Sequence, residues 1–461
     1  MQSNLRNNAL DPTEAALWSD GNWTATPPAP LNGVFSDTRA AAPGALFIAI
    51  KGENFDGHEF VEKAFDCGAA AAMVDEDNPL PSSRPARPLL RVKNTRDALR
   101  SLAAGYRAKI NPRVIGITGS AGKTTTKEWT AALLSTAFKT AKTPGNLNND
   151  LGLPFSLLAM PADAEIGVFE AGTNHPGEIA PLAALMRPTV AILTNIAPVH
   201  IGNFGSEQAI ADEKAALLRA LPPDGAAILD AASPYFACLA AQASCRVIAV
   251  GETPSCDYSA SEIDAATGEF SVHEKSSHET HRIRTGQSGT HNVTNALMAI
   301  AAARHFGVPW QSMDPAFADM PALDKRWQRI EKDGVHWIND AYNANPLSME
   351  KALERFALEP CAARRIAVLG DMFELGDYAE TGHRRTGSAA ARAGLDLLLT
   401  VGEMSSRWLA ASAVEAGMSA EKIERMETAI AAKTFLKQNL RAGDLILLKA
   451  SRGMRLEALL S

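Results

Sequence analysis

Positive charge, cysteine and long apolar runs are scarce in this chain, and each shortage excludes a class of protein. The 461 residues include 45 Lys and Arg against 52 Asp and Glu, a net charge of −7. Nucleic-acid binders normally carry a basic field, so this balance argues against nucleic acid as a partner. No uncharged apolar stretch is long enough to span a bilayer, and residues 1–20 lack the basic start and apolar run of a signal peptide. We therefore expect a soluble, cytoplasmic protein without membrane insertion.

The cysteines are few, and their spacing does not suggest pairs. Their number is odd and no C-x-x-C pair occurs among Cys67, Cys238, Cys245, Cys256 and Cys361. This pattern favours free thiols in a reducing compartment over a disulfide framework or a zinc site. With 46% hydrophobic and 21% charged residues the composition is ordinary for a globular protein. A chain of this length exceeds one compact core, so we expect about three domains.

Apolar runs alternate with helical segments along most of the chain, which is the pattern of parallel sheets covered by helices. In the middle of the chain the runs are VIGITG, IGVFEAG, VAILTNI, AAILD and VIAVG. Towards the end they are VHWIND, RIAVLGD, LLLTVGE and LILLKAS. The first hundred residues instead place short apolar runs between Pro and Gly, which is typical of small strands and turns, and include a helix that ends at Gly68.

The run ITGSAGKTTTKE, residues 117–128, lies between a predicted strand and a predicted helix. It departs from the usual G-x-x-x-x-G-K-S/T spacing, because an isoleucine stands where the first glycine is expected. Gly119 and Gly122 still let the backbone approach phosphates, and the amides at a helix start attract anions. Lys123 can reach the outer phosphates, and Thr124 can offer its hydroxyl to Mg²⁺. A glycine turn with an exposed lysine is the alternative, but the strand-to-helix context favours a nucleotide loop.

These patterns predict an α/β protein of three domains, over residues 1–108, 109–320 and 321–461. The central domain is expected to hold a P-loop NTPase-like parallel sheet, between a small N-terminal α/β domain and a Rossmann-like C-terminal α/β domain. Residues 252–288 are polar and predict an exposed hairpin or loop region. The three histidines there lack the spacing of metal ligands.

Two polar side chains follow apolar runs of the predicted middle sheet. Glu170 ends the run IGVFE, and His200 comes shortly after VAILTNI, both predicted as neighbouring strands of one sheet. A carboxylate at a strand end can bind Mg²⁺ directly or through water. A glutamate paired with a lysine and a structural histidine are the alternatives.

Asparagine is concentrated in two further segments. TPGNLNNDLGLP, residues 143–154, combines turn residues with amide side chains that suit phosphate or amide groups, and a hydrogen-bonded surface loop is an equal alternative. GTHNVTNALMAIAAA opens a helix with His291, Asn292 and Asn295, where polar residues are usually caps.

Taken together, these motifs resemble the ATP-dependent Mur ligases of bacterial cell-wall synthesis. The loop of that family is G-x-x-G-x-x-G-K-T/S, which GITGSAGKT fits from Gly116 onward. Further matching runs are TPGNLNNDLGLP, FEAGTNHPGEI, DAYNANPLSM, VLGDMFELG and KASRGMRLE. Several independent motifs match in order over nearly the whole chain, so chance does not account for the resemblance.

The resemblance implies roles for particular residues. Nucleotide contacts are implied at Gly119, Ser120, Ala121, Gly122, Lys123, Thr124, Thr125, Asn292, Asn295, Arg326 and Asp340. Mg²⁺ ligands are implied at Thr124, Glu170 and His200, and catalytic roles at Lys123, Glu170, His200 and Lys214. Substrate contacts are implied at Ser36, Thr38, Arg39, Asp56, His58, Asn146, Asn149, Asn343, Asn345, Asp371, Glu374, Lys449, Ser451 and Arg452.

The chain departs from the family pattern at two positions. The uridine-binding segment, commonly D-S-R, is Asp37-Thr38-Arg39, a change that keeps a hydroxyl. Lys325 stands where a glycine commonly precedes the arginine, which leaves the local turn in question.

Lys214, in SEQAIADEKAALLRAL, aligns with a lysine that the family carries in carbamylated form. A carbamate is anionic and could help to hold a Mg²⁺-binding shell beside Glu170 and His200. The reaction with CO₂ needs a neutral amine, hence a lysine whose pKa is depressed. A solvated lysine on an amphipathic helix is the alternative.

The implied reaction is amide-bond formation by a monomeric ATP- and Mg²⁺-dependent, ADP-forming ligase of peptidoglycan precursor synthesis. ATP would phosphorylate the terminal carboxylate of UDP-N-acetylmuramoyl-tripeptide, and the amine of D-alanyl-D-alanine would attack the acyl phosphate. The alternatives are another amide ligase of the same architecture, such as the tripeptide-forming Mur ligase or a folylpolyglutamate synthetase, or an NTPase that regulates a partner. The sequence does not distinguish diaminopimelate from lysine as the third peptide residue.

Overall fold

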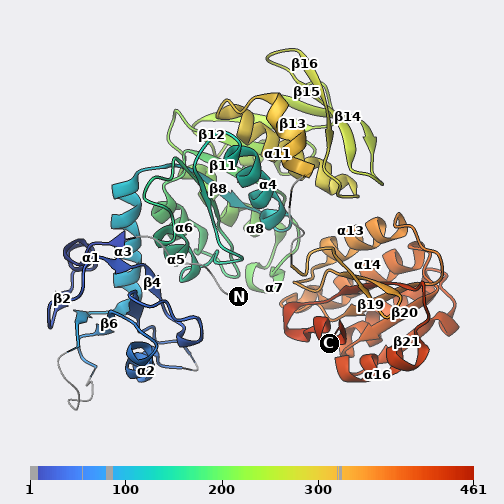
Figure 1. Ribbon diagram of the computed structural model, residues 1–461. Coiled ribbons are helices and arrows are strands. Elements are labelled where there is room, and N and C mark those ends of the chain that lie inside the picture. Colours follow the sequence, from blue (N-terminus) through green and yellow to red (C-terminus); the bar gives the residue numbers. More distant parts are fainter. Residues whose placement is uncertain (1–8, 54, 79–86, 319, 321–323, 461) are drawn as a thin grey trace.

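The computed structural model describes residues 9–53, 55–78, 87–318, 320 and 324–460. Three large sheets follow one another along the described chain, besides the small pair of β1 and β3, and with their helices they form three units arranged as an arch (Figure 1). The predicted α/β class with three domains is confirmed. The predicted boundary at residues 320 and 321 falls partly outside the described residues and stays a prediction.

The first unit is built on a five-stranded sheet with the order β2-β7-β6-β5-β4. Its strands, with the separate pair β1 and β3, are β1 (Ala9–Leu10), β2 (Asn22–Trp23), β3 (Leu31–Asn32), β4 (Val34–Phe35), β5 (Leu46–Ile48), β6 (Ala71–Asp75) and β7 (Leu89–Val92). Its helices are α1 (Pro12–Ser19), α2 (Val61–Asp66) and α3 (Thr95–Ile110). The predicted helix before Gly68 is present as α2, and Gly68 takes a φ of +95°, which lets the chain turn into β6.

Helix α3 lies between the first and middle units. Asn94 caps it by accepting hydrogen bonds from the amides of Arg96 and Asp97. One side of α3 packs against α1, and the other against α5 (Gly152–Leu158) and α6 (Ile179–Met186) of the middle unit. The helix runs through the predicted boundary between residues 108 and 109, which stays a prediction.

The middle unit holds a nine-stranded sheet with the order β16-β15-β14-β13-β12-β11-β8-β10-β9. Its strands are β8 (Arg113–Thr118), β9 (Thr140–Lys142), β10 (Ile166–Glu170), β11 (Val190–Leu193), β12 (Ala226–Asp230), β13 (Arg246–Gly251), β14 (Tyr258–Asp264), β15 (Glu269–Glu274) and β16 (Glu279–Arg284). Besides α5 and α6, its helices are α4 (Lys123–Ser135), α7 (Ile201–Phe204), α8 (Glu207–Lys214), α9 (Ala216–Arg219), α10 (Phe236–Ala240), α11 (Thr290–His305) and α12 (Met313–Ala318). Strands β8 to β13 are parallel, as their apolar runs predict.

The polar stretch from 252 to 288 is more ordered than the sequence predicts. It forms β14, β15 and β16, which extend the middle sheet, with β15 antiparallel to both neighbours. Phe270, Val272 and Ile283 point into the same core as Trp310. The outer face of these strands is polar. Apolar and polar residues therefore alternate along each strand, and no continuous apolar run marks the strands in the sequence.

The third unit holds a six-stranded sheet with the order β17-β18-β22-β19-β20-β21. Its strands are β17 (Gln328–Lys332), β18 (Val335–Asn339), β19 (Arg365–Gly370), β20 (Leu397–Val401), β21 (Ile423–Met426) and β22 (Leu445–Lys449). Its helices are α13 (Pro346–Ala357), α14 (Ala379–Arg392), α15 (Ala410–Glu415) and α16 (Ala429–Asn439). Only β17 pairs in the antiparallel sense, and apolar clusters cover both faces of the sheet. Across the described residues, no helix is both long enough and apolar enough to cross a bilayer.

Gly387 of α14 lies against the backbone of a neighbouring helical segment in the third unit. A Cβ placed there would lie 2.2 Å from the backbone oxygen of Leu409, in the neighbouring helical segment. We predict that Gly387→Ala lowers the free energy of unfolding by about 1–3 kcal/mol, because backbone must shift to admit the methyl group. Denaturant melts measure the effect. Thr381→Ala, on the exposed side of the same helix, is the control and should change stability by about 0.5 kcal/mol or less. Equal stabilities for the two variants would contradict this account of the packing.

Candidate active site

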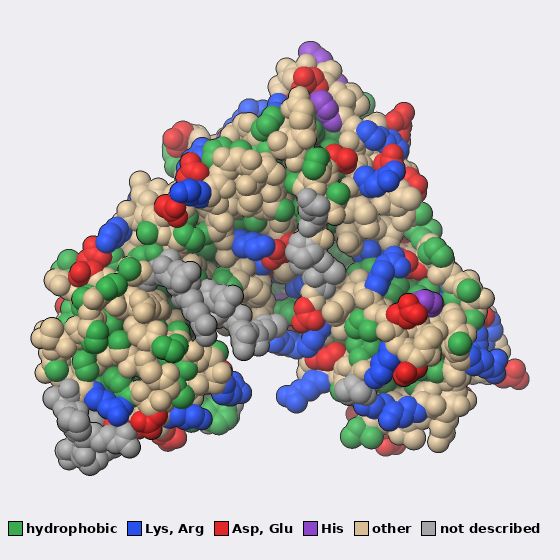
Figure 2. Space-filling model, viewed as in Figure 1, with side chains coloured by type: hydrophobic (Ala, Val, Ile, Leu, Met, Phe, Trp, Pro, Cys, Tyr) green, Lys and Arg blue, Asp and Glu red, His purple; other side chains and the backbone are tan. Residues whose placement is uncertain are grey.

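A cavity of about 1800 Å³ opens where the carboxyl ends of the middle strands face the third unit. In the space-filling view the first and third units stand apart below the middle unit, and Lys and Arg side chains border the hollow between them (Figure 2). The cavity brings together most of the predicted site residues: Ser120, Ala121, Gly122, Lys123, Thr124, Thr125, Asn146, Asn149, Glu170, His200, Asn292, Asn295, Arg326, Asp340, Asn343, Asn345, Lys449 and Arg452.

The glycine loop between β8 and α4 forms one wall of the cavity. Gly119 has a φ of +146°, and a Cβ there would lie 1.9 Å from the Thr194 hydroxyl oxygen. Gly122 has a φ of +79°, and its Cβ would lie 2.7 Å from the side-chain oxygen of Asn295. Neither position admits a larger residue, so the loop stays close to its neighbours and α4 can begin at Lys123. Lys123, Thr124 and Thr125 line the cavity, and the first amides of a helix have no partner within the helix, as an anion site requires.

Lys123 is folded back onto the loop. Its Nζ donates a hydrogen bond to the backbone oxygen of Gly119 at 2.7 Å. Burial lowers the pKa of Lys123 to about 8; Glu170 raises it and Arg326 lowers it further. The ammonium therefore lies in a poorly solvated position, where the negative charge of a phosphate would favour its protonated form.

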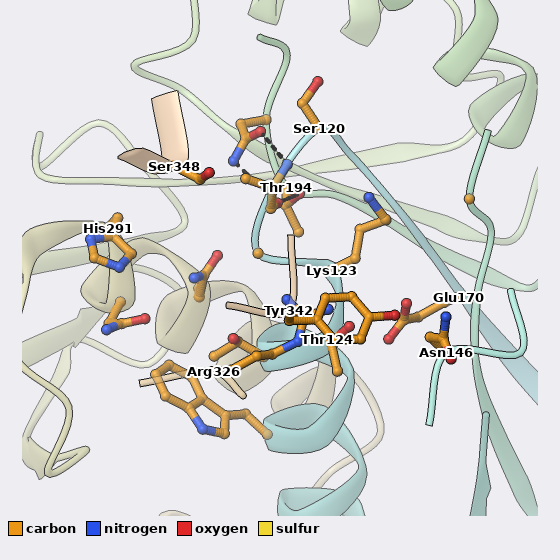
Figure 3. A pocket seen from close by; sticks show the side chains of 18 of the residues that line it. Ser120, Lys123, Thr124, Asn146, Glu170, Thr194, His291, Arg326, Tyr342 and Ser348 are labelled. Atoms are coloured by element: carbon orange, nitrogen blue, oxygen red, sulfur yellow. Dashed lines mark hydrogen bonds between the residues drawn. The ribbon is translucent and has the colours of Figure 1, made fainter. Parts of the chain in front are cut away.

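Glu170 is fully buried at the end of β10, and its two carboxylate oxygens differ. Oε2 accepts a hydrogen bond from Asn148 Nδ2 at 3.1 Å. Oε1 accepts none, and lies 3.4 Å from Lys127 Nζ. Buried polar atoms are normally hydrogen-bonded, so an oxygen that has only an ion-pair contact with Lys127 can accept a further ligand. Figure 3 shows Glu170 close to Thr124, Asn146 and Tyr342, with Lys123 above them.

One carboxylate oxygen and the Thr124 hydroxyl are hard oxygen ligands that suit Mg²⁺. The described part of the chain contains no cluster of three His, Cys, Asp or Glu side chains placed to hold a metal. The residues therefore fit a Mg²⁺ that takes its other ligands from water and from substrate phosphates, the usual arrangement for this ion.

The strands that lead to Glu170 and to His200 lie on opposite sides of β8. The sequence predicts neighbouring strands for the two residues, but β10 and β11 each pair with β8, which runs between them. Nδ1 of His200 makes a close contact with the Glu374 carboxylate of the third unit. Burial lowers the pKa of His200, and Glu374 opposes that shift. The His200 side chain of the middle unit therefore contacts the third unit.

Lys214 ends α8 with only 4% of its surface exposed. Burial and then the nearby charge of Lys123 lower its pKa to about 7. The side chain is therefore not the solvated lysine of the alternative interpretation. It is not among the cavity-lining residues, so its role stays a prediction.

The third unit contributes a group of paired charges. Asp340 and Lys449 form an ion pair at 2.5 Å, and the Arg326 guanidinium stacks 4.1 Å from the centre of the Tyr342 ring. Lys325 takes a φ of +54°, in the left-handed region that favours glycine. The position therefore keeps the backbone conformation that a glycine would adopt, and the turn forms with lysine at a cost of about 1 kcal/mol.

Several predicted residues lie outside the cavity. These are Ser36, Thr38, Arg39, Asp56 and His58 of the first unit, Gly119 and Lys214 of the middle unit, and Asp371, Glu374 and Ser451 of the third. His58 is buried, with Nδ1 2.6 Å from Asp56 and Nε2 accepting the Asp75 amide. Asp371 accepts the amide of Ser405 at 2.7 Å. Both side chains are held by protein atoms, and their contacts with substrate stay predictions.

Sequence reasoning missed other residues at the cavity or beside it. They are Lys127, Asn148, Gln287, Ser288, Trp327, Tyr342, Arg355 and Glu359. Lys127 had a usable signal, because it stands four residues after Lys123 and so lies on the same face of the helix. Asn148 sits inside the predicted asparagine segment but could not be distinguished from its neighbours.

A buried polar network joins the middle and third units beside the cavity. Arg355 donates to the Ser288 hydroxyl at 2.7 Å and stacks 4.0 Å from the centre of the Trp327 ring. Glu359 accepts hydrogen bonds from Ser288, Trp327 and Arg329. Burial lowers the pKa of Arg355 to about 9. Through Ser288 the network joins the third unit to the segment that leads into α11, and each of its charged groups has a partner.

Comparison with known proteins agrees with this geometry. Residues 30–107, 117–303 and 325–452 match, in order, the Mur ligase family catalytic domain, the Mur ligase middle domain and the Mur ligase glutamate ligase domain. The chain belongs to the Mur ligase family.

Particular relatives extend over nearly the whole chain. A UDP-N-acetylmuramoyl-tripeptide–D-alanyl-D-alanine ligase of Bacillus subtilis is 38% identical, covering 93% of this chain and 92% of its own. The enzyme of the same name from Escherichia coli is 37% identical, covering 83% and 84%. Crystal structure I of MurF from Acinetobacter baumannii has a TM-score of 0.85 at 31% identity, with 98% of both chains covered. The MurF ligase of Thermotoga maritima in complex with ADP has a TM-score of 0.76 at 26% identity, covering 93% and 96%.

The loop geometry predicts that Lys123 and Thr124 act on bound phosphate and metal, not on the fold. We expect Lys123→Met and Thr124→Ala to lose ligation, and Lys123→Met to weaken binding of a non-hydrolysable ATP analogue by about ten- to a hundredfold, because a charge-assisted contact is lost. Titration calorimetry measures the affinity, and circular dichroism checks the fold. Lys139→Met, an exposed lysine paired with Asp163, is the control and should bind normally. Normal turnover in either site variant would rule out the loop assignment.

Proposed function

We propose that this chain is an ATP-dependent, ADP-forming ligase that joins D-alanyl-D-alanine to UDP-N-acetylmuramoyl-tripeptide. One observation carries the proposal: a single cavity holds the phosphate loop, the buried Glu170 and the Asn-rich loop of the middle unit, and the Arg326, Asp340 and Lys449 group of the third. A site assembled from two units suits a reaction that needs a nucleotide and two further substrates. The names of relatives that match over nine-tenths of the chain support the same activity.

The residues divide between the two units according to the chemistry. The loop amides, Lys123 and Arg326 would hold the ATP phosphates, and Asp340 the ribose. Asn146 and Asn149 would place the tripeptide carboxylate beside the γ-phosphate. Mg²⁺ bound at Glu170 and Thr124 would supply charge compensation to the transferring phosphoryl group.

The cationic side chains would stabilise each step of the transfer. A carboxylate is a poor acyl donor until one of its oxygens leaves as phosphate, which is why ATP must first form the acyl phosphate. Lys123 and the loop amides would neutralise charge on the phosphoryl group and on the tetrahedral intermediate that the dipeptide amine then forms. Asn343, Asn345, Lys449 and Arg452 would receive the zwitterionic dipeptide. The cavity walls from two units would keep water from hydrolysing the acyl phosphate.

Phosphate release measured with purified protein tests the proposal. We expect release only when ATP, UDP-N-acetylmuramoyl-tripeptide and D-alanyl-D-alanine are all present, with an amide product seen by mass spectrometry. Tripeptides ending in diaminopimelate and in L-lysine are offered separately. Reactions with diaminopimelate, L-lysine or glutamate as the amine, with their matching acceptors, are the controls. Turnover with one of these amines, or hydrolysis without any peptide, would assign a different ligase or a regulatory NTPase.

Lys214 gives a second prediction within the proposed reaction. With its pKa near 7, the neutral amine that reacts with CO₂ forms as the pH rises through about 7. We expect Lys214→Ala to lower activity by about tenfold or more, since the anionic carbamate that supports the metal site cannot form. Acetate or formate should restore part of the activity by filling the vacated anionic site.

The CO₂ dependence separates this role from a structural one. Wild-type activity should fall in CO₂-depleted buffer and recover on adding bicarbonate, whereas Lys214→Ala should not respond. Normal turnover of Lys214→Ala, or wild-type activity that ignores CO₂, would remove carbamylation from the mechanism.

A further inference from the structure

Lys127 of helix α4 is a fully buried lysine that the proposed reaction does not use. An ammonium taken out of water costs several kcal/mol unless other charges and hydrogen bonds replace its hydration. Its surroundings must therefore compensate the charge, and the residues that do so show what the side chain holds in place.

The Lys127 ammonium has four oxygen partners within 3.4 Å. It donates hydrogen bonds to the backbone oxygens of Thr143 and Gly145, each at 2.9 Å. It lies 2.9 Å from Glu128 Oε1 and 3.4 Å from Glu170 Oε1. These partners come from two places besides its own helix: the start of the asparagine loop, residues 143–149, and the end of β10.

The asparagine loop and Glu170 are also bonded to each other. The Glu170 amide donates to the Thr143 hydroxyl at 3.0 Å, and Asn148 Nδ2 donates to Glu170 Oε2. Lys127 therefore closes a ring of contacts that joins α4, the asparagine loop and Glu170. Helix α4 begins with Lys123 and Thr124, so the ring ties the phosphate loop to the asparagine loop and to Glu170.

We propose that Lys127 is a positioning residue that fixes the asparagine loop and Glu170 relative to the phosphate loop. The inference rests on the proposed ligase function. Lys127 makes no contact with the reacting groups; it sets the spacing between the nucleotide phosphates and the place where the acceptor carboxylate binds. Rigid placement of two reactants is worth far more than the individual contacts, because a misplacement of about 1 Å can cost a hundredfold in rate.

The role predicts an asymmetric kinetic effect. In Lys127→Met the phosphate loop keeps its glycines, its amides and Lys123, so ATP should bind as before. The asparagine loop loses two hydrogen bonds from a charged donor. We therefore expect the KM for the UDP-linked tripeptide to rise about tenfold or more and kcat to fall, while the KM for ATP changes by less than about twofold.

A neighbouring lysine supplies a matched control. Lys142 also pairs with the Glu128 carboxylate, but its side chain is 44% exposed and, among the described residues, the ammonium bonds only to Glu128. Lys142→Met removes one cation from the same carboxylate and should leave both KM values unchanged. An equal effect of the two substitutions would assign Lys127 a role in balancing Glu128 only, and would overturn the proposal.

A second variant covers the case in which Lys127→Met does not fold. Thr143→Val keeps the side-chain shape and removes the hydroxyl that accepts the Glu170 amide, so it breaks the same ring on its opposite side. The proposal requires the same asymmetric rise in the KM for the tripeptide substrate. Calorimetry measures the affinity of each variant for an ATP analogue, and so tests the phosphate loop independently of turnover.

Three further results would contradict the inference. Unchanged KM values with fewer active sites would indicate a purely structural lysine, and equal rises for ATP and the tripeptide substrate would indicate general damage to the cavity. Unchanged kinetics in Thr143→Val would show that the ring does not hold the loop. Wild-type protein that fails to ligate any tripeptide would instead remove the proposed function, which keeps the two failures distinct.

Discussion

The arrangement of the active site depends on one buried carboxylate surrounded by cations. Glu170 lies within the electrostatic reach of Lys123 and 3.4 Å from Lys127, while Lys214 and Arg326 add further positive charge around the same space. Without a ligand the local balance is positive and poorly solvated, and the pKa values of Lys123 and Lys214 are depressed accordingly. A triphosphate is the kind of ligand that relieves this repulsion, because it brings several negative charges into a site that water does not fill.

Residues of both the middle unit and the third unit line the cavity. The middle unit alone offers the glycine loop and a buried carboxylate that could hold Mg²⁺, but the ion pair of Asp340 with Lys449 and the Arg326–Tyr342 stack belong to the third unit. The network of Arg355, Ser288 and Glu359 sets how the two units meet. His200 bound to Glu374 adds a second point of contact. A nucleotide held by residues of both units would favour the arrangement in which the units are closed around it. The shift in that equilibrium equals the difference between the nucleotide's binding free energies for the closed and the open arrangement.

Much of the fold and of the candidate site could be predicted from the sequence, because the sequence patterns that indicate them are local. Strands with continuous apolar runs, the glycine loop and the residues at strand ends follow from patterns a few residues long. The outer strands β14 to β16 were predicted only as an exposed hairpin or loop region, and their place in the middle sheet was not foreseen, because only one of their faces is apolar. The roles of Lys127 and Asn148 were missed, because they depend on which distant backbone oxygens a side chain meets after folding. Lys325 looked like an irregularity until its left-handed φ showed that the turn is retained.

Helix α3 connects the first unit to the middle unit. It is a continuous helix of 16 residues that packs against α1 on one side and against α5 and α6 on the other. Bending it would break backbone hydrogen bonds, so we expect the first and middle units to move together as one frame. A precursor held by its uridine end in the first unit would then meet the phosphate loop at a fixed reach. A peptide stem one residue too short would leave its carboxylate about 3.5 Å from the transferable phosphate, so the frame can act as a gauge of precursor length.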